Sequence, residues 1–519
     1  MRRSDALNRR SFLQYAAGAA AATALSPPPP LRQTIDLEEA TIPSLQAGLR
    51  AGRYTSRSLC EAYLRRIEAL DRSGPTLRAV LETNPDALAI ADRLDAERKA
   101  GRVRGPLAGI PVLIKDNIAT ADRMMTTAGS LALVGATPPR DAFVAERLRA
   151  AGAVILGKTN LSEWANFRGN QSSSGWSGRG GQCKNPYALD RNPCGSSSGT
   201  GAAIAANLAA VGVGTETDGS IVCPSSACSL VGVKPTLGLI SGAGIIPIAH
   251  SQDTAGPMAR TVTDAAILLG VLGGKDYSGD LDPNGLKGAR IGVARKKCFG
   301  YSPEADALVE AAIDVLRRQG AILVDPADVP HLGEYDDSEF TVLLYEFKAD
   351  LNAYLAEWAP RGPMRTLADL IAFNDANKNL ELLYFGQEIF VQAQEKGPLT
   401  DQAYLDALEK DRRLSRTEGL DAAFAQNNLD AIVAPTGSPP WPTDLVNGDH
   451  FLGASSTPAA VSGYPSISVP VGYSFGLPVG MSLIGRAWSE PTLLRLAYAY
   501  EQAAKPRRPP RFLWTAELP

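Results

Sequence analysis

The chain has 519 residues, of which 45% are hydrophobic and 21% are charged, and its formal net charge is −3. A chain of this length and ordinary apolar content can bury a large core, which excludes disorder, collagen and coiled coil as descriptions of the whole chain. The near-neutral charge argues against a nucleic-acid partner, because such proteins usually present a basic face.

The first 26 residues have the pattern of an export signal. Arg9 and Arg10 precede an uncharged, alanine-rich run at positions 15–25, and the prolines at 27–30 end any helix there. Paired arginines before an apolar run are typical of twin-arginine (Tat) export, and the run is too short to span a bilayer permanently. We therefore predict a twin-arginine-type signal peptide over residues 1–26, contact with the Tat export machinery during translocation, and a periplasmic or secreted bacterial protein without a permanent membrane span.

Apolar spacing predicts helices that alternate with short strands. A helix is expected behind the capping residue Thr55, where Leu59, Tyr63 and Ile67 recur at helical spacing. The alternation indicates an α/β fold. Since no linker interrupts it, residues 27–519 are expected to form a single domain. The other predicted helices cover residues 85–99, 142–150 and 200–210, with further helical patterning from 302 to 429, and the predicted strands cover residues 109–114, 153–156, 211–214, 431–433, 467–470 and 479–484.

The cysteines are too few for a disulfide scaffold in a chain of this length. Export permits disulfide bridges, but the sequence does not say which cysteines would pair. Cys223 and Cys228 lie five residues apart with no histidine nearby, so a zinc site is not expected and buried thiols are favoured. The six cysteines are Cys60, Cys183, Cys194, Cys223, Cys228 and Cys298.

Residues 152–159 match the P-loop pattern letter for letter. A P-loop needs a flexible turn whose backbone N–H groups wrap a phosphate. Here the four variable positions are Ala, Val, Ile and Leu, which make the would-be loop itself a strand. The segment, which includes Lys158, is therefore interpreted as a strand followed by a turn.

A second motif, residues 195–199, matches the Gly-x-Ser-x-Gly nucleophile elbow with Ser197 at its centre. An elbow must follow a strand, yet turn-forming residues precede this one. The base would have to be one of the three histidines, His250, His331 or His450. An esterase built on Ser197 is kept as an alternative.

Two glycine-rich segments support a third interpretation. Residues 195–201 are followed, after the predicted alanine-rich helix, by residues 214–221 at the end of a predicted strand. Backbone N–H groups beside a serine hydroxyl are what an oxyanion hole requires. Histidine is scarce, so the base is expected to be a lysine whose pKa falls through burial below its usual value of about 10.4. Lys115, at the end of an apolar strand, is the candidate.

The order of Lys115, the glycine- and serine-rich loop and Ser220 resembles the amidase signature family. Ser196 and Ser220 are 24 residues apart, a spacing that fits the signature block of that family. Residues 192–199 and 214–220 look most like those of bacterial peptide amidases, which remove the terminal amide from C-terminally amidated peptides. The likeness covers most of the mature chain and includes residues 109–117, 157–160, 181–186, 232–236, 253–260, 434–436 and 463–465.

The resemblance implies an amidase signature fold, in which helices flank a central mixed β-sheet on both faces, with a catalytic core from Lys115 to Ser220. It implies a Ser–cis-Ser–Lys triad, with Ser220 as the nucleophile, Ser196 as the bridging serine and Lys115 as the base. The bridging serine would follow a cis peptide bond, here between Gly195 and Ser196, and Gly195 and Ser197 would support the triad. No metal or other cofactor is expected.

The resemblance also implies an oxyanion hole built from the backbone N–H groups of four consecutive residues, Thr217, Asp218, Gly219 and Ser220. Asp218 departs from the glycine that many family members carry at this position. A carboxylate facing the oxyanion would oppose catalysis, so the carboxylate of Asp218 is predicted to point away from it.

The segment at residues 166–181 is expected to line the substrate cleft. It is rich in Gly, Ser and Asn and poor in periodicity, and a long irregular segment inside a compact protein is usually functional or disordered. Trp164, Arg168 and Trp176 are the candidates for contact with the substrate.

These observations favour a metal-free serine amidohydrolase that acts on linear carboxamides, above all the C-terminal amide of peptides. Ammonia would leave through an acyl-enzyme on Ser220, and the expected partner is a small-molecule or peptide amide, with no nucleic acid. The alternatives are a broad-specificity aryl or aliphatic amidase of the same family, the Ser197 esterase, and an exported binding protein without catalysis. A transfer-RNA amidotransferase subunit shares the signature, but the export signal and the lack of a basic run argue against that role.

Overall fold

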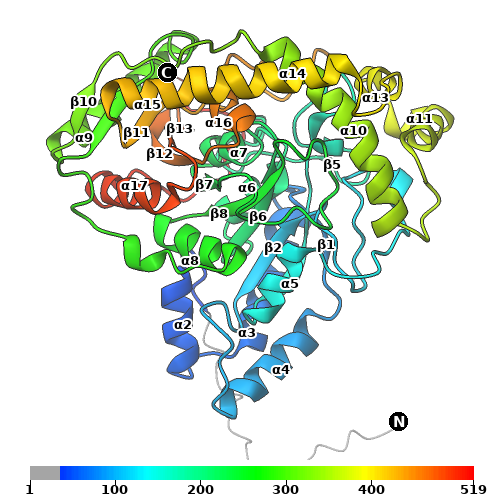
Figure 1. Ribbon diagram of the computed structural model, residues 1–519. Coiled ribbons are helices and arrows are strands. Elements are labelled where there is room, and N and C mark those ends of the chain that lie inside the picture. The colour runs from blue at the N-terminus through cyan, green and yellow to red at the C-terminus, as the bar shows by residue number, and fades with distance from the viewer. Residues whose placement is uncertain (1–34, 519) are drawn as a thin grey trace, which may run out of the picture. The chain divides into compact units, whose positions relative to one another are not determined.

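A mixed β-sheet of eleven strands runs through residues 35–518, the part of the chain that the structure, a computed structural model, describes (Figure 1). Residues from Leu37 onward form one compact unit. The predicted signal peptide at residues 1–26 lies outside the described residues. In order across the sheet, the strands are β1 (Val80–Thr83), β3 (Val154–Thr159), β2 (Pro111–Lys115), β6 (Val211–Glu216), β8 (Thr254–Ala259), β7 (Val231–Lys234), β12 (Ser466–Ser474), β13 (Leu477–Ile484), β11 (Ala431–Pro435), β9 (Arg290–Val293) and β10 (Ile322–Val324).

The sheet contains two parallel regions within an otherwise antiparallel arrangement. β2 runs parallel to both of its neighbours, β3 and β6, and β9 runs parallel to β11 and β10. The other neighbouring strands are antiparallel. The predicted α/β fold with a central mixed sheet is therefore confirmed.

Helices cover both faces of this sheet (Figure 1). α6 and α7 pack against each other and against the strands on one face, while α8, α9 and α17 form a second layer. No helix within residues 35–518 is both long enough and apolar enough to cross a membrane. The helices are α2 (Ile42–Arg50), α3 (Ser56–Ile67), α4 (Ala87–Lys99), α5 (Phe143–Ala150), α6 (Ser198–Ala205), α7 (Val222–Ala227), α8 (Val262–Gly273), α9 (Pro303–Arg318), α10 (Asp336–Trp358), α11 (Leu367–Ala376), α12 (Lys378–Glu381), α13 (Glu388–Gln394), α14 (Gln402–Arg412), α15 (Asp421–Asn427), α16 (Thr457–Ser462) and α17 (Glu490–Ala504).

The predicted elements are recovered with small shifts of their ends. Thr55 caps α3, where its hydroxyl accepts a hydrogen bond from the Ser58 N–H and Ser58 Oγ accepts one from the Thr55 N–H. The helix predicted over 200–210 is α6, and it ends earlier because Asn207 adopts a left-handed backbone with φ of 59°. The strand predicted over 109–114 is β2, which extends to include Lys115.

The three strands that position the candidate site are buried along their whole length. Every residue of β2, β3 and β6 is buried, which is typical of parallel strands covered on both faces. Burial continues through the polar residues at the ends of these strands, so Lys115, Lys158 and Thr159 are all enclosed by protein.

A disulfide joins Cys194 to Cys223, so the buried thiol favoured at Cys223 is wrong, and the pairing that the sequence leaves open is settled for these two cysteines. The two cysteines are 29 residues apart in the sequence, and only the fold brings their Cα atoms to 5.9 Å. The bridge links the segment just before Gly195 to α7. The other four cysteines are free and buried, which confirms the expectation of a buried thiol at Cys228.

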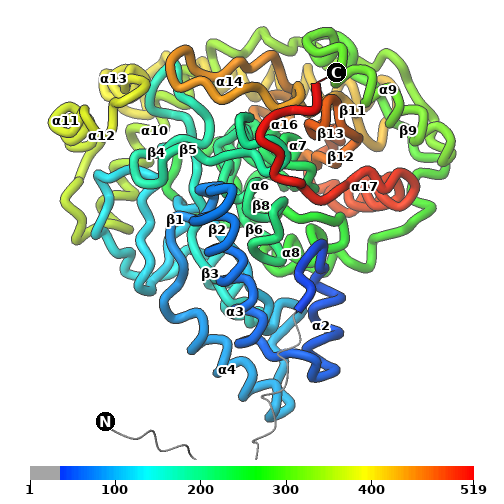
Figure 2. The backbone as a smooth tube through the Cα atoms, turned by 180° about the vertical axis from the view of Figure 1, so that it is seen from behind, coloured from blue at the N-terminus to red at the C-terminus, as the bar shows by residue number. Residues whose placement is uncertain are grey.

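The segment after α17 crosses the back of the fold and braces the loop that precedes the serine-rich segment (Figure 2). Leu513 forms a β-bridge with Ala188, and its carbonyl accepts a hydrogen bond from the Leu189 N–H at 2.8 Å. Residues near the C-terminus thereby help to position the loop that leads to Ser196.

Candidate active site

The candidate site lies at the carboxyl ends of three neighbouring strands. β3, β2 and β6 are parallel to one another, and they end at Thr159, Lys115 and Glu216. The segments that follow these ends meet at one edge of the sheet, which is where α/β proteins commonly bind ligands.

Lys115 is buried, and its side-chain nitrogen contacts three oxygen atoms. Nζ lies 2.8 Å from Ser196 Oγ, 2.9 Å from Thr215 Oγ1 and 3.2 Å from the Thr215 carbonyl oxygen. Burial lowers the pKa of Lys115 to about 7, although Asp253 and Glu216 act in the opposite direction. A neutral amine has two N–H groups and one lone pair. The two oxygens of Thr215 can accept both hydrogens, which leaves the lone pair facing the Ser196 hydroxyl.

Ser196 is fixed through its backbone. The peptide bond between Gly195 and Ser196 is cis, as the resemblance implies, and the Ser162 N–H donates to the Ser196 carbonyl at 3.0 Å. A Cβ atom at Gly195 would lie 2.2 Å from Ser162 Oγ, so glycine is required at this close approach. Ser196 is fully buried, and its hydroxyl is therefore shielded from bulk solvent.

Ser220 lines a cavity of about 470 Å³, together with Gly195 and Gly219. Its carbonyl accepts a hydrogen bond from the Ser197 N–H at 3.1 Å, which holds the two serine-bearing segments side by side. Ser197 Oγ donates to the Thr215 carbonyl at 3.0 Å and accepts from the Thr215 N–H at 3.2 Å. Ser197 thus connects the Ser220 segment to the end of β6, which fits its predicted supporting position.

The turn after β6 presents four backbone N–H groups without an intramolecular acceptor. Within residues 35–518, no acceptor is hydrogen-bonded to the N–H groups of residues 217–220. The next two N–H groups, of Ile221 and Val222, donate to Glu216 Oε2 at 2.6 and 2.9 Å. Glu216 therefore closes the turn. Gly219 has a left-handed backbone with φ of 79°, which favours glycine.

Two further contacts orient the side chains of this turn. Thr217 Oγ1 donates to Asp253 Oδ1 at 2.6 Å, and burial raises the pKa of Asp253 to about 7. The carboxylate of Asp218 turns toward the start of α16, where the Thr457 hydroxyl donates to Oδ2 at 2.7 Å. This contact directs Oδ2 toward α16, and Asp218 also lines the cavity beside Ser220.

Three residues predicted to contact the substrate lie in the protein interior instead. Trp164, Arg168 and Trp176 keep only 2%, 0% and 4% of their surface exposed. Arg168 pairs with Glu163 at 3.2 Å and lies over the ring of Phe385 at 4.2 Å. These large side chains brace the fold, so their assignment to the cleft is wrong.

Smaller residues of the same segment do reach the cavity. Asn166 and Ser174 are among its lining residues. Residues 164–166 all have positive φ, at 49°, 57° and 70°, and consecutive left-handed residues other than glycine are uncommon outside functional sites. The prediction that residues 166–181 line the cleft is therefore confirmed at Asn166 and Ser174.

The two competing motifs have structural explanations. Lys158 lies within β3 and donates to the Ile118 carbonyl at 2.6 Å and to Thr126 Oγ1 at 2.8 Å, which confirms a strand in place of a P-loop. The hydroxyl of Ser197 is hydrogen-bonded to the Thr215 backbone on both sides. His331, one of the bases that an elbow would need, faces Glu334 at 3.0 Å.

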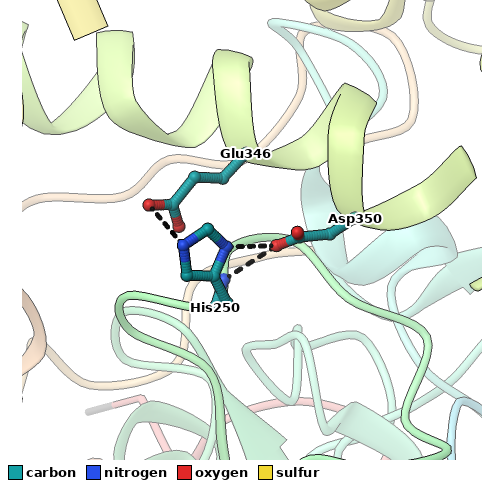
Figure 3. Close-up of side chains that lie close together, drawn as sticks. All are labelled: His250, Glu346 and Asp350. Atoms are coloured by element: carbon teal, nitrogen blue, oxygen red, sulfur yellow. Dashed lines mark hydrogen bonds and ion pairs between the residues drawn. The ribbon is translucent and has the colours of Figure 1, made fainter. Parts of the chain in front are cut away.

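His250 lies between two carboxylates of α10 (Figure 3). Its Nδ1 is 2.8 Å from Asp350 Oδ2, and its Nε2 is 3.3 Å from Glu346 Oε1. Among residues 35–518, this trio is the group of His, Cys, Asp and Glu side chains close enough to hold a metal ion, with ligand atoms within 4.8 Å of one another. The hydrogen bond to Asp350 raises the pKa of His250.

The family follows from this arrangement together with the match to a known family model. The model for the family described as Amidase matches residues 58–494. The chain belongs to the amidase signature family. It is an amidase hydrolase, and its mixed sheet with flanking helices is the fold of this family.

Similar proteins cover nearly the whole chain. A probable amidase of Arabidopsis thaliana is 43% identical over 508 residues, which are 93% of each chain. The crystal structure of the native peptide amidase of Stenotrophomonas maltophilia is 54% identical, covers 91% of this chain and 99% of that chain, and superposes with a TM-score of 0.87. A glutamyl-tRNA(Gln) amidotransferase subunit of Chloroflexus aurantiacus is 36% identical over 490 residues, which are 90% of this chain and 97% of that protein.

The sequence alone assigned no role to four residues that hold the site together, namely Asn117, Thr215, Glu216 and Asp253. Asn117 Nδ2 donates to Thr215 Oγ1 at 2.9 Å and so orients Thr215 beside Lys115. Glu216 closes the turn and Asp253 holds Thr217. All four lie within motifs that carry the family resemblance, which is the one signal in the sequence that could have indicated them.

Replacing Glu216 with alanine tests the turn. Glu216→Ala removes the acceptor for two N–H groups, so the four neighbouring N–H groups lose their fixed orientation. We expect kcat to fall about tenfold to hundredfold with little change in KM, because one oxyanion donor typically contributes about 10²–10³ in kcat. Glu216→Gln keeps an oxygen that can accept both hydrogen bonds and should retain most of the activity. Steady-state rates of ammonia release measure both variants.

Asp71→Ala is the matched control. Asp71 is also buried, and its carboxylate also accepts two backbone N–H groups, at 2.6 Å from Ala79 and 3.2 Å from Val80. It is not among the residues that line the cavity with Ser220. A fall in kcat as large for Asp71→Ala as for Glu216→Ala would contradict a specific role for the turn.

Proposed function

We propose that this amidase hydrolyses the C-terminal amide of peptides through an acyl-enzyme on Ser220, with Ser196 as the bridging serine and Lys115 as the base. The observation that carries the proposal is the 2.8 Å contact between Lys115 Nζ and Ser196 Oγ in a buried site. A lysine with a pKa of about 7 is largely uncharged at pH 8 and can accept a proton.

In the first half of the reaction, Ser220 Oγ forms a bond to the amide carbon. Its proton passes to Ser196 Oγ as the Ser196 proton passes to Lys115 Nζ. The negative charge that develops on the substrate oxygen is held by the N–H groups of residues 217–220. The relay then returns a proton to the amide nitrogen, the C–N bond breaks, and ammonia leaves.

In the second half, water attacks the ester formed on Ser220. Lys115 accepts the proton of this water through Ser196, and the same N–H groups hold the second oxyanion. Return of the proton to Ser220 Oγ breaks the ester bond and releases the carboxylic acid. Each step uses groups that the chain itself supplies, and the only co-reactant is water.

The choice of a peptide substrate is supported by the 54% identity to a peptide amidase. It is also supported by the cavity of about 470 Å³ beside Ser220, which is large enough for a side chain on the acyl side of the amide. Ammonia, in contrast, needs little room. An aryl or aliphatic amidase of broad specificity remains the alternative that the experiment below separates.

The test compares ammonia release from C-terminally amidated peptides and from small aryl and aliphatic amides. We expect the peptides to give the higher kcat/KM. Lys115→Met should lower kcat by about 10²–10⁴, the usual contribution of a general base. A fluorophosphonate should label Ser220 and leave Ser197 unmodified. Equal or better turnover of small amides would favour the broad-specificity enzyme, and labelling of Ser197 would favour the esterase.

Lys158→Met is the control for loss of a buried lysine. Lys158 is as buried as Lys115 and lies in the neighbouring strand, but it contacts a carbonyl and a threonine hydroxyl away from the serines. Retention of activity by Lys115→Met, in a folded protein, would refute the assigned base.

We also propose that residues 1–26 direct export through the twin-arginine route. The paired arginines and the uncharged run that follows support this proposal. In a bacterial host, replacing both Arg9 and Arg10 with lysine should leave the unprocessed chain inside the cytoplasm. Fractionation that finds the double variant in the periplasm as often as the parent would contradict Tat export.

A further inference from the structure

The cavity beside Ser220 has apolar walls supplied by elements remote in the sequence. Phe340 and Leu343 come from the first turns of α10, and Trp441 and Phe451 come from the loop before α16. The rings of Trp441 and Phe451 meet edge to face, with centroids 5.8 Å apart. Such walls suit the methylene stem of a long side chain, and aromatic faces attract cations.

The charged groups that line this cavity are all acidic. Its described lining residues include no lysine, arginine or histidine. A cleft lined by one sign of charge concentrates the field of that sign, so this cavity favours cationic groups. The four carboxylates are those of Asp218, Asp336, Glu339 and Asp449.

Burial raises the pKa of Asp449, and three neutral donors act in the opposite direction. Its carboxylate accepts hydrogen bonds from the Ser174 N–H at 2.9 Å, from Asn192 Nδ2 at 3.1 Å and from Trp441 Nε1 at 3.1 Å. These three donors favour the ionised form but leave its charge without a cationic partner. Asp336 adds an exposed carboxylate at the first residue of α10.

Burial raises the pKa of both Asp218 and Glu339, and the nearby carboxylate of Asp218 raises the pKa of Glu339 further. Glu339 Oε1 accepts a hydrogen bond from Gln252 at 2.9 Å, and Lys234, which does not line the cavity, offsets part of the effect on Asp218. Asp218 Oδ1 is buried without a hydrogen bond of good geometry, although the Ser456 hydroxyl, which also lines the cavity, lies near the carboxylate and lowers its pKa. A buried acceptor without a donor is unfavourable, and a ligand that brings an N–H group would satisfy it.

We propose that this cavity recognises a positively charged group of the substrate, either an ammonium or a guanidinium. The inference rests on the proposed function, because it assumes that the acyl part of the amide enters the cavity beside Ser220. The group has two sources in a peptide amide, the side chain of lysine or arginine and the free α-amino group of a very short peptide.

Matched substrates separate these sources. N-acetyl-arginine amide and N-acetyl-citrulline amide have the same shape, but only the first is charged. We expect kcat/KM to be about tenfold or more higher for the arginine amide, the effect of one charge-assisted hydrogen bond, and the ratio to shrink as salt is added. The free α-amino group is tested separately, by comparing kcat/KM for citrulline amide with kcat/KM for N-acetyl-citrulline amide.

Variants of α10 test whether the acidic cavity causes the preference. Asp336→Asn and Glu339→Gln should each lower the charged-to-neutral ratio about threefold or more, while hydrolysis of N-acetyl-citrulline amide persists. Asp337→Asn is the matched control, because Asp337 is the exposed neighbour of Asp336 but does not line the cavity. It should leave the ratio unchanged.

The possible results distinguish failure of cation recognition from failure of the proposed amidase function. Equal hydrolysis of charged and neutral amides in the parent enzyme would overturn cation recognition and leave the amidase assignment intact. A preference that survives both Asp336→Asn and Glu339→Gln would also overturn it. Failure to release ammonia from any of these amides would overturn the proposed function and the inference together.

Discussion

The site depends on one interaction, the hydrogen bond between a buried lysine amine and a buried serine hydroxyl. An ammonium ion is costly to remove from water, so complete burial lowers the pKa of Lys115 to about 7. Asp253 and Glu216 favour the charged form, yet burial outweighs them because neither carboxylate forms a hydrogen bond with Nζ. A neutral amine can accept a proton only where its lone pair faces a proton donor. Because the two Thr215 oxygens can accept both N–H groups of Lys115, the lone pair faces the Ser196 hydroxyl.

The sheet imposes the rest of the geometry. Because β3, β2 and β6 are parallel neighbours, their carboxyl ends bring Ser162, Lys115 and the turn after Glu216 to one edge. Cross-connections between backbones then fix the side chains, notably from Ser162 to Ser196 and from Ser197 to Ser220. The disulfide between Cys194 and Cys223 adds a covalent link between the same two segments.

Much of this arrangement could be predicted from the sequence, because strands buried on both faces are continuous apolar runs and the serine-rich motifs are distinctive. The parts that could not be predicted depend on distance in space. Glu216 accepts hydrogen bonds from two N–H groups of the turn that follows it, and Asp253 accepts one from Thr217, a residue 36 positions earlier in the chain. Nothing in the spacing of these residues along the sequence indicates either partner. The pairing of Cys194 with Cys223 could not be predicted for the same reason. Arg168 was misassigned because a charged residue in an irregular segment resembles a ligand contact until its burial against Glu163 and Phe385 is seen.

In the proposed mechanism, the acidic cavity beside Ser220 attracts a cationic substrate, while burial keeps the pKa of Lys115 low enough for it to act as the base. The most direct test of this account is the titration of the Lys115 amine by NMR, in protein labelled with ¹³C at the lysine ε-carbon and assigned with Lys115→Met. The account predicts a midpoint near pH 7, below those of the buried lysines Lys158 and Lys234, whose pKa burial lowers to about 8. A midpoint near the ordinary lysine value of about 10.4 would contradict it.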